Sequence, residues 1–129
     1  MTESSLDDAK RNRQVGWAFQ GMESAFKFLV DDFQYRVGDA RIHQEGSYLT
    51  FLGVNAMIEL TYEEWWNGFS AIVASRGGGQ DNIWDLLARR DPKGTWPTPD
   101  RTKRISREDA TSLLFRWADG LRNLAADVL

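Results

Sequence analysis

Cysteine is absent from this chain, and histidine occurs once. Without cysteine the protein has no disulfide bond, no thiol nucleophile and no thiolate ligand for a metal ion. The chain also has no apolar run approaching the ~20 residues that span a bilayer, so we expect no membrane segment and no membrane partner. Its N-terminus places acids before bases and lacks the apolar core of a secretory signal, which favours a cytoplasmic protein.

What is present is typical of one globular domain. The chain has 129 residues, of which 42% are hydrophobic and 27% charged. A chain of this size can bury about 65% of its unfolded surface, enough for one core. Residues 1–15 are polar and lack periodicity, which predicts a frayed N-terminus. Residues 16–129 are predicted to form a single α+β domain.

Charge is distributed unevenly along the chain. From Asp31 to Asp85 there are nine acids and three bases, a net charge of −6, whereas from Arg89 to Arg107 there are seven bases and two acids, a net charge of +5. Such segregation can steer a charged partner towards the protein, or the two segments can pair with each other. A third interpretation is that both segments are simply solvated.

Apolar residues recur at helical spacing before the strand-like region. Four of them, separated by four, three and four positions, fall on one helical face: Met22, Phe26, Leu29 and Phe33. We expect this helix to end near Asp32, because the next residues become β-like and Gly38-Asp39 is a turn signal.

Short alternating segments with turn signals between them follow. The candidate strands are residues 35–37 continuing to 41–43, then 48–52, 56–62 and 69–75. In the strand 56–62 every second residue is apolar, which is the pattern of a half-buried strand. Because the connections are short enough for hairpins, the sequence predicts an antiparallel meander of about four strands.

Two helices and a long connection complete the chain. Residues 81–90 have the pattern of a short helix, residues 91–105 form a basic loop with all three prolines, and residues 106–128 form a final helix capped by Ser106. Gly120 interrupts the apolar stripe of that helix, which indicates that something packs closely there. The predicted fold is α+β, with an N-terminal and a C-terminal helix covering one face of the meander.

His43 is the first candidate for catalytic chemistry. The chain offers no nucleophile elbow beside it and no second histidine for a metal site. His43 and Glu45 could share one face of a strand, but two ligands without a third make a weak metal site. We therefore expect a surface or edge-strand histidine, with no catalytic residue, no metal and no cofactor.

Paired acids form the next candidate site. Glu63 and Glu64 point to opposite faces if both lie in a strand, so they would not share one substrate. Asp31 and Asp32 lie at a helix C-terminus, on the unfavourable side of the helix dipole. The alternatives are that these acids present charge to a basic partner or that they are solvated.

Two glycine-rich or basic segments resemble anion-binding loops in composition. The run SRGGGQDN (75–82) lies between a strand and a helix, but the lysine of a phosphate loop is missing, which favours a hinge. The loop 91–105 carries Trp96 among basic residues that include Arg101, Lys103 and Arg104, a composition also found where single-stranded nucleic acid is bound. Because the protein is acidic overall, nucleic acid is not the expected partner.

The stretch TYEEWWNG contains the most unusual residues of the chain. Trp65 and Trp66 are adjacent in an extended segment, so one should point inward and the other outward. An outward tryptophan beside acids has the composition of an interface hot spot. The alternative is that both rings fold over the edge of the sheet.

The order FKFLVDDFQYRV, SYLTFLGVNAMIELTY, WDLLARR and ISREDATSLLFRWADGLRNLAADVL resembles a loose group of small bacterial α+β proteins. In that group an acidic helix leads into an antiparallel sheet that an amphipathic C-terminal helix closes. Some members are immunity proteins of polymorphic toxin systems. The resemblance covers residues 26–128 and implies a protein partner, but it carries over no active-site residue.

Three functions remain open from the sequence. The first is a non-catalytic, immunity-type protein that binds a basic toxin through Asp31, Asp32, Glu63, Glu64, Trp65 and Trp66. The second is an enzyme or ligand-binding domain with a pocket between sheet and helices, lined by His43, Tyr62, Trp96, Arg101, Lys103 and Arg104. The third is a structural homodimer subunit joined through Phe115 and the tryptophan hairpin.

Overall fold

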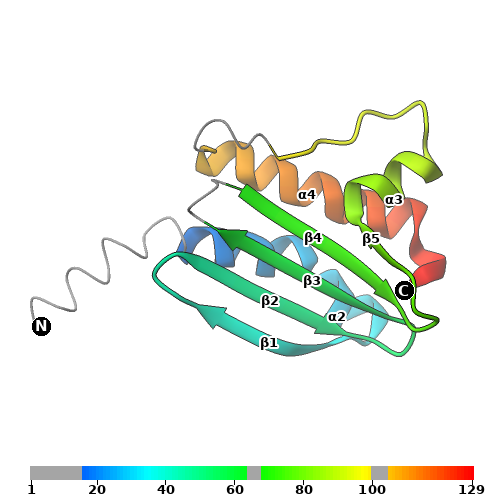
Figure 1. Cartoon of the computed structure of the whole chain (residues 1–129), viewed down its shortest axis with the longest axis horizontal. Helices are drawn as coiled ribbons and strands as arrows, with labels where there is room; N and C mark the ends of the chain where they lie inside the picture. The colour runs from blue at the N-terminus through cyan, green and yellow to red at the C-terminus, as the bar shows by residue number, and fades with distance from the viewer. Residues whose placement is uncertain (1–15, 64–67, 100–104) are drawn as a thin grey trace, which may run out of the picture.

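The computed structural model describes residues 16–63, 68–99 and 105–129, and their fold is α+β as predicted (Figure 1). Helical residues 16–26 and α2 (Phe28–Phe33) come first. The strands are β1 (Arg36–Ile42), β2 (Gly46–Leu52), β3 (Ala56–Glu63), β4 (Gly68–Ser75) and β5 (Gln80–Asn82). The chain then forms α3 (Ile83–Arg90), α4 (Arg107–Leu124) and a 3₁₀ helix (Ala126–Val128).

The sequence predicts one continuous N-terminal helix, and the structure divides it into two pieces. A turn at Lys27 separates residues 16–26 from α2, and the predicted apolar stripe is inward, with Met22, Phe26 and Leu29 fully buried. The helix ends one residue after the predicted Asp32, at Phe33. Gln34 follows with φ of 60°, the left-handed conformation that ends many helices.

The sheet has the strand order β1-β2-β3-β4-β5, and each strand is antiparallel to its neighbours. The predicted meander is therefore confirmed. Gly38-Asp39 is a β-bulge within one continuous β1, where we had predicted a turn. Glycine is required at the bulge because a Cβ at position 38 would lie 2.7 Å from the Leu52 side chain.

A fifth strand is present that the sequence did not predict. The triple glycine forms the β4–β5 turn, in which the Ser75 N–H donates to the Gly79 carbonyl at 2.7 Å and Gly78 adopts φ of 99°. This turn takes the place of the predicted hinge. β5 has three polar residues and pairs with residues 72–74 of β4. Its polar side chains give no alternating signal, which explains why it was missed.

Within the described residues, helices cover one face of the sheet and leave the other open. In β2, β3 and β4 fully buried residues alternate with half-buried ones. The buried set packs in one core with residues 18–29 and with α3 and α4, which lie on one side of the sheet in Figure 1. We call the opposite side the open face.

The last helix begins where the sequence indicates. The Ser106 hydroxyl accepts a hydrogen bond from the Asp109 N–H at 3.1 Å, which is the predicted cap. Trp117 is fully buried, and its indole N–H donates to the Pro97 carbonyl at 2.8 Å. The helix therefore holds both the core and the start of the proline-containing loop.

Candidate functional site

Apolar side chains cross the open face in a row. Leu52, Met57 and Ala74 are direct cross-strand partners on β2, β3 and β4, and all three are half-buried. We call these three residues the apolar row. A hollow of about 340 Å³ lies at this end of the sheet, and the exposed Val54 lines it beside the apolar row. Apolar surface in an uncovered position is typical of an interaction site.

Two arginines flank the apolar row. Arg36 is the cross-strand partner of Leu52 on β1, and Arg76 lines the hollow on the opposite side, next to Ala74 and Ser75. Neither forms an ion pair with any residue that the structure describes. Both cations are therefore available to a ligand with acidic or carbonyl groups.

The opposite end of the open face carries acids and aromatic rings. On β3, the side chains on the open side include Glu59, Thr61 and Glu63, and Tyr48 of β2 is the cross-strand partner of Thr61. The Arg41 guanidinium lies 4.8 Å from the centre of the Tyr48 ring and donates to Asp39 at 2.8 Å. The open face is thus basic at one end and contains acids towards the other.

His43 lies just beyond β1, exposed, as predicted for an edge histidine. Its ring is edge-on to Tyr48, with 5.8 Å between ring centres. An open hollow of about 400 Å³ adjoins it, lined by residues 43–46 and Tyr48. Nowhere in the described part of the chain do three His, Cys, Asp or Glu side chains come together to hold a metal ion.

The predicted partner-binding acids do not form one surface. Glu63 lies on the open face near the end where Trp17 packs on Tyr62, with 6.3 Å between their rings. Asp31 and Asp32 lie in α2, at the opposite end of the N-terminal helical residues from Trp17. They come just before Tyr35, whose ring packs against Gly53. Glu64, Trp65 and Trp66 fall outside the described residues.

Asp32 contributes to packing between the helices. Its carboxylate lies 3.0 Å from the Arg122 guanidinium of α4, which in turn lies 5.8 Å from the Phe28 ring. Both ionic groups are about half exposed, so the pair contributes little to stability. The alternative of a purely solvated helix end therefore holds for Asp31 more than for Asp32.

Trp96 is packed against α4. Its indole N–H donates to the Asp91 carbonyl at 3.3 Å, and the Arg116 guanidinium lies 4.1 Å from the ring centre. A Cβ on Gly120 would lie 2.7 Å from both the Trp96 ring and the Leu87 side chain. This contact explains the glycine in the middle of α4, as its position in the stripe had indicated.

A third hollow, of about 200 Å³, adjoins Trp96. Its lining residues are Asp91, Trp96, Arg116, Asp119, Gly120, Asn123 and Leu124. The predicted pocket was to combine Trp96 with His43 and Tyr62, and the structure does not bring these three together. Tyr62 is fully buried on the covered side of the sheet, and His43 contacts Tyr48 on the open side. Arg101, Lys103 and Arg104 lie outside the described residues.

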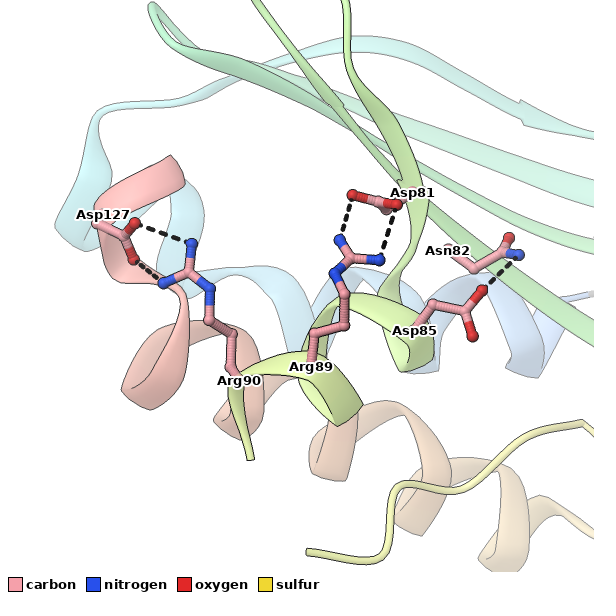
Figure 2. Close-up of polar contacts among 6 residues, drawn as sticks. All are labelled: Asp81, Asn82, Asp85, Arg89, Arg90 and Asp127. Carbon is pink, nitrogen blue, oxygen red and sulfur yellow. Dashed lines mark hydrogen bonds and ion pairs between the residues drawn. The ribbon is translucent and has the colours of Figure 1, made fainter. Parts of the chain in front are cut away.

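The basic segment is partly neutralised by acids elsewhere in the chain. Two arginines at the end of α3 each make a two-pronged ion pair (Figure 2): Arg89 with Asp81 of β5, and Arg90 with Asp127 of the 3₁₀ helix. The hydrogen bonds from Arg90 hold the pKa of Asp127 below its usual value. Pairing between the two oppositely charged segments, one of the three interpretations of the charge pattern, therefore occurs at Asp81.

Sequence reasoning did not identify the apolar row. Its three residues occupy the alternate positions that face away from the core, so a signal was present in the strand pattern. What was missing was the register, since only the pairing of β2 with β3 and β3 with β4 puts Leu52, Met57 and Ala74 side by side.

Comparison with known protein families, curated proteins and solved structures gives no match to this chain. Within the described residues no helix has the length and apolar character to cross a membrane. The function must therefore be argued from the surface of the molecule itself.

Proposed function

We propose that this protein is a non-catalytic binding protein whose protein partner docks on the open face of the sheet. The observation that carries the proposal is the apolar row, which is left uncovered beside two arginines without ion pairs among the described residues. Protein interfaces combine an apolar centre with a polar rim in this way. Met57 at the centre of the row suits such a site, because methionine adapts its shape to a partner.

We propose further that the partner is a toxin and that the protein acts as an immunity-type inhibitor in the cytoplasm. The resemblance of residues 26–128 to a group containing immunity proteins supports this. On the open face, Glu59 and Glu63 would contact basic groups of the toxin, and the apolar row would cover part of its apolar surface. Trp65 and Trp66 directly follow this acidic end in the sequence and would extend the contact.

The experiment uses a partner protein that co-purifies with this protein and measures their binding by calorimetry. We expect Met57→Glu to weaken binding by about tenfold or more, because it puts a charge at the apolar centre. Phe115→Glu is the matched control, since Phe115 is an exposed apolar residue on α4, away from the open face. Equal affinity of the Met57→Glu variant and the unchanged protein would refute this docking site.

A second candidate function rests on the hollow beside Trp96. An aromatic ring, a guanidinium, two carboxylates and an amide meet there, which is a set of groups suited to a small polar ligand. A thermal-shift screen with nucleotides, metabolites and metal salts tests this function, because a ligand bound only by the folded state raises the melting temperature. A shift that Trp96→Ala abolishes would favour a ligand-binding domain, and the absence of any shift would count against it.

A further inference from the structure

β1 is an edge strand with backbone groups available for pairing. The His43 N–H donates to the Gly46 carbonyl at 2.8 Å, so this is a hydrogen-bonded pair of the β1–β2 ladder. Hydrogen-bonded pairs occur at every second residue of an antiparallel ladder. The backbone N–H and C=O groups of Arg41 and Asp39 are therefore the next two sets that face β2. The N–H and C=O groups of Ala40 and Ile42 then point away from the sheet.

The helix layer also stops short of β1. Val37, Ala40 and Ile42 lie on the same side of the sheet as the core, because their cross-strand partners are Phe51, Leu49 and Ser47. Those partners are almost fully buried, whereas Val37 is 48% and Ile42 47% exposed. An uncovered apolar strip therefore runs along the edge of an otherwise buried face, and a new strand beside β1 would cover it.

The charges of β1 select what can be added there. Asp39 and Arg41 lie on the open face on either side of Ala40. When two antiparallel copies of β1 pair with Ala40 opposite Ala40, each Asp39 faces Arg41 of the partner subunit. The neighbouring registers place Asp39 opposite Asp39 or Arg41 opposite Arg41, and like charges opposite each other destabilise a strand pair.

Hydrogen bonding is compatible with the same register. With Ala40 opposite Ala40, the outward backbone groups of both strands meet, as an antiparallel ladder requires. The bulge at Gly38 and the edge charges are devices that normally prevent edge-to-edge pairing. Here the charges of Asp39 and Arg41 disfavour the two neighbouring symmetric registers and complement this one, so they specify a partner of the same sequence.

We propose that the protein forms a symmetric homodimer through β1, with a two-fold axis at Ala40. The two five-stranded sheets join into one continuous sheet whose helices all lie on one side. The ion pairs between Asp39 and Arg41 are exchanged between the subunits, and Ile42 lies opposite Gly38 of the partner subunit. This interface does not include the apolar row, so it is independent of the proposed function.

Sedimentation equilibrium at low salt tests the dimer by charge exchange. We expect the unchanged protein to be dimeric, and Asp39→Arg and Arg41→Asp each to weaken the dimer about tenfold or more, because each creates two like-charge contacts. The double variant Asp39→Arg/Arg41→Asp restores opposite charges and should restore the dimer. Circular dichroism checks that each variant is folded.

Two further variants separate this interface from others. Ala40→Pro removes an N–H that points away from β2 and should give a folded monomer, since proline is accepted on such an edge. Phe115→Glu and Met57→Glu should leave the dimer intact. A protein that is monomeric at high concentration, a dimer that survives either single charge reversal, or a dimer lost on Phe115→Glu would overturn the proposal.

Discussion

Gln34 adopts a backbone conformation that non-glycine residues usually avoid. Its φ of 60° ends α2, and the N–H groups of Gln34 and Tyr35 both donate to the Leu29 carbonyl. This turn brings Tyr35 under the sheet. There its hydroxyl donates a hydrogen bond to the backbone carbonyl of Leu129 at 3.1 Å. The strain at one exposed residue therefore positions a buried tyrosine that connects two ends of the described fold.

Relieving that strain should stabilise the protein. The left-handed conformation costs a side-chain-bearing residue about 1–2 kcal/mol, and glycine avoids this cost but loses more entropy on folding. We expect Gln34→Gly to raise the free energy of unfolding by about 0.5–1 kcal/mol, measured by urea denaturation. Gln34→Ala is the control and should give no gain. A glycine variant no more stable than the alanine variant would contradict this account.

At the scale of elements, the loop and α4 depend on each other through three contacts. Trp96 packs on Gly120, Arg116 covers the ring, and Trp117 holds the Pro97 carbonyl. Residues 91–99 have no helix or strand, yet they are attached to α4 at three points. The basic loop is thus part of the packed structure over these residues.

A double-mutant cycle tests the Trp96–Gly120 contact. Alanine in a helix interior is favoured over glycine by about 1 kcal/mol, but here its Cβ would lie 2.7 Å from the rigid Trp96 ring. We expect Gly120→Ala to destabilise the protein by about 1–3 kcal/mol. In a Trp96→Ala background the same change should stabilise it, because only the flexible end of Leu87 must then move. The same sign in both backgrounds would rule out this explanation.

α3 is held at its C-terminal end by Arg90 and Asp127, and this pair should be visible in the pH dependence of stability. The pKa of Asp127 is lower in the folded protein than its ordinary value of 3.8. The unfolded state therefore takes up the proton first, so the contribution of the pair is present above 3.8 and is lost as pH falls through the lowered pKa.

The measurement compares Asp127→Asn with the unchanged protein in urea denaturation between neutral and strongly acid pH. The stability difference should be present at neutral pH and disappear below the folded pKa, and it should be small because both groups are exposed. Asp119→Asn, which removes an exposed carboxylate without an ion pair among the described residues, is the control. A difference that is independent of pH would contradict the assignment.

For the whole molecule, the sheet offers two separate surfaces. The open face carries the apolar row at the end of the sheet where Gly53 lies, and the β1 edge carries Asp39 and Arg41. In the proposed dimer the two open faces adjoin on the same side. A dimer would then present two partner-binding sites together, and the Met57→Glu and Asp39→Arg variants separate the two properties.

Most of the fold could be predicted from local patterns. Alternation in residues 56–62, the apolar stripes of the first and last helices and the Ser106 cap each act within a few residues, and all are confirmed. β5 and the bulge at Gly38 were not predicted, because the polar β5 gives no alternating signal and the bulge depends on how β1 pairs with β2. The site was less predictable, since acids that look equivalent in the sequence lie at opposite ends of the molecule.

The sequence by itself determined the fold class, the order of the helices and of the first four strands, and the presence of a free face, because periodicity and capping are local properties of the chain. Only the tertiary structure decided which side chains meet. Register placed Leu52 beside Met57 and Ala74, packing placed Trp96 on Gly120, and the helix layer left β1 uncovered. These contacts join residues of different elements, so they follow from how the elements pack and not from the pattern within any one of them.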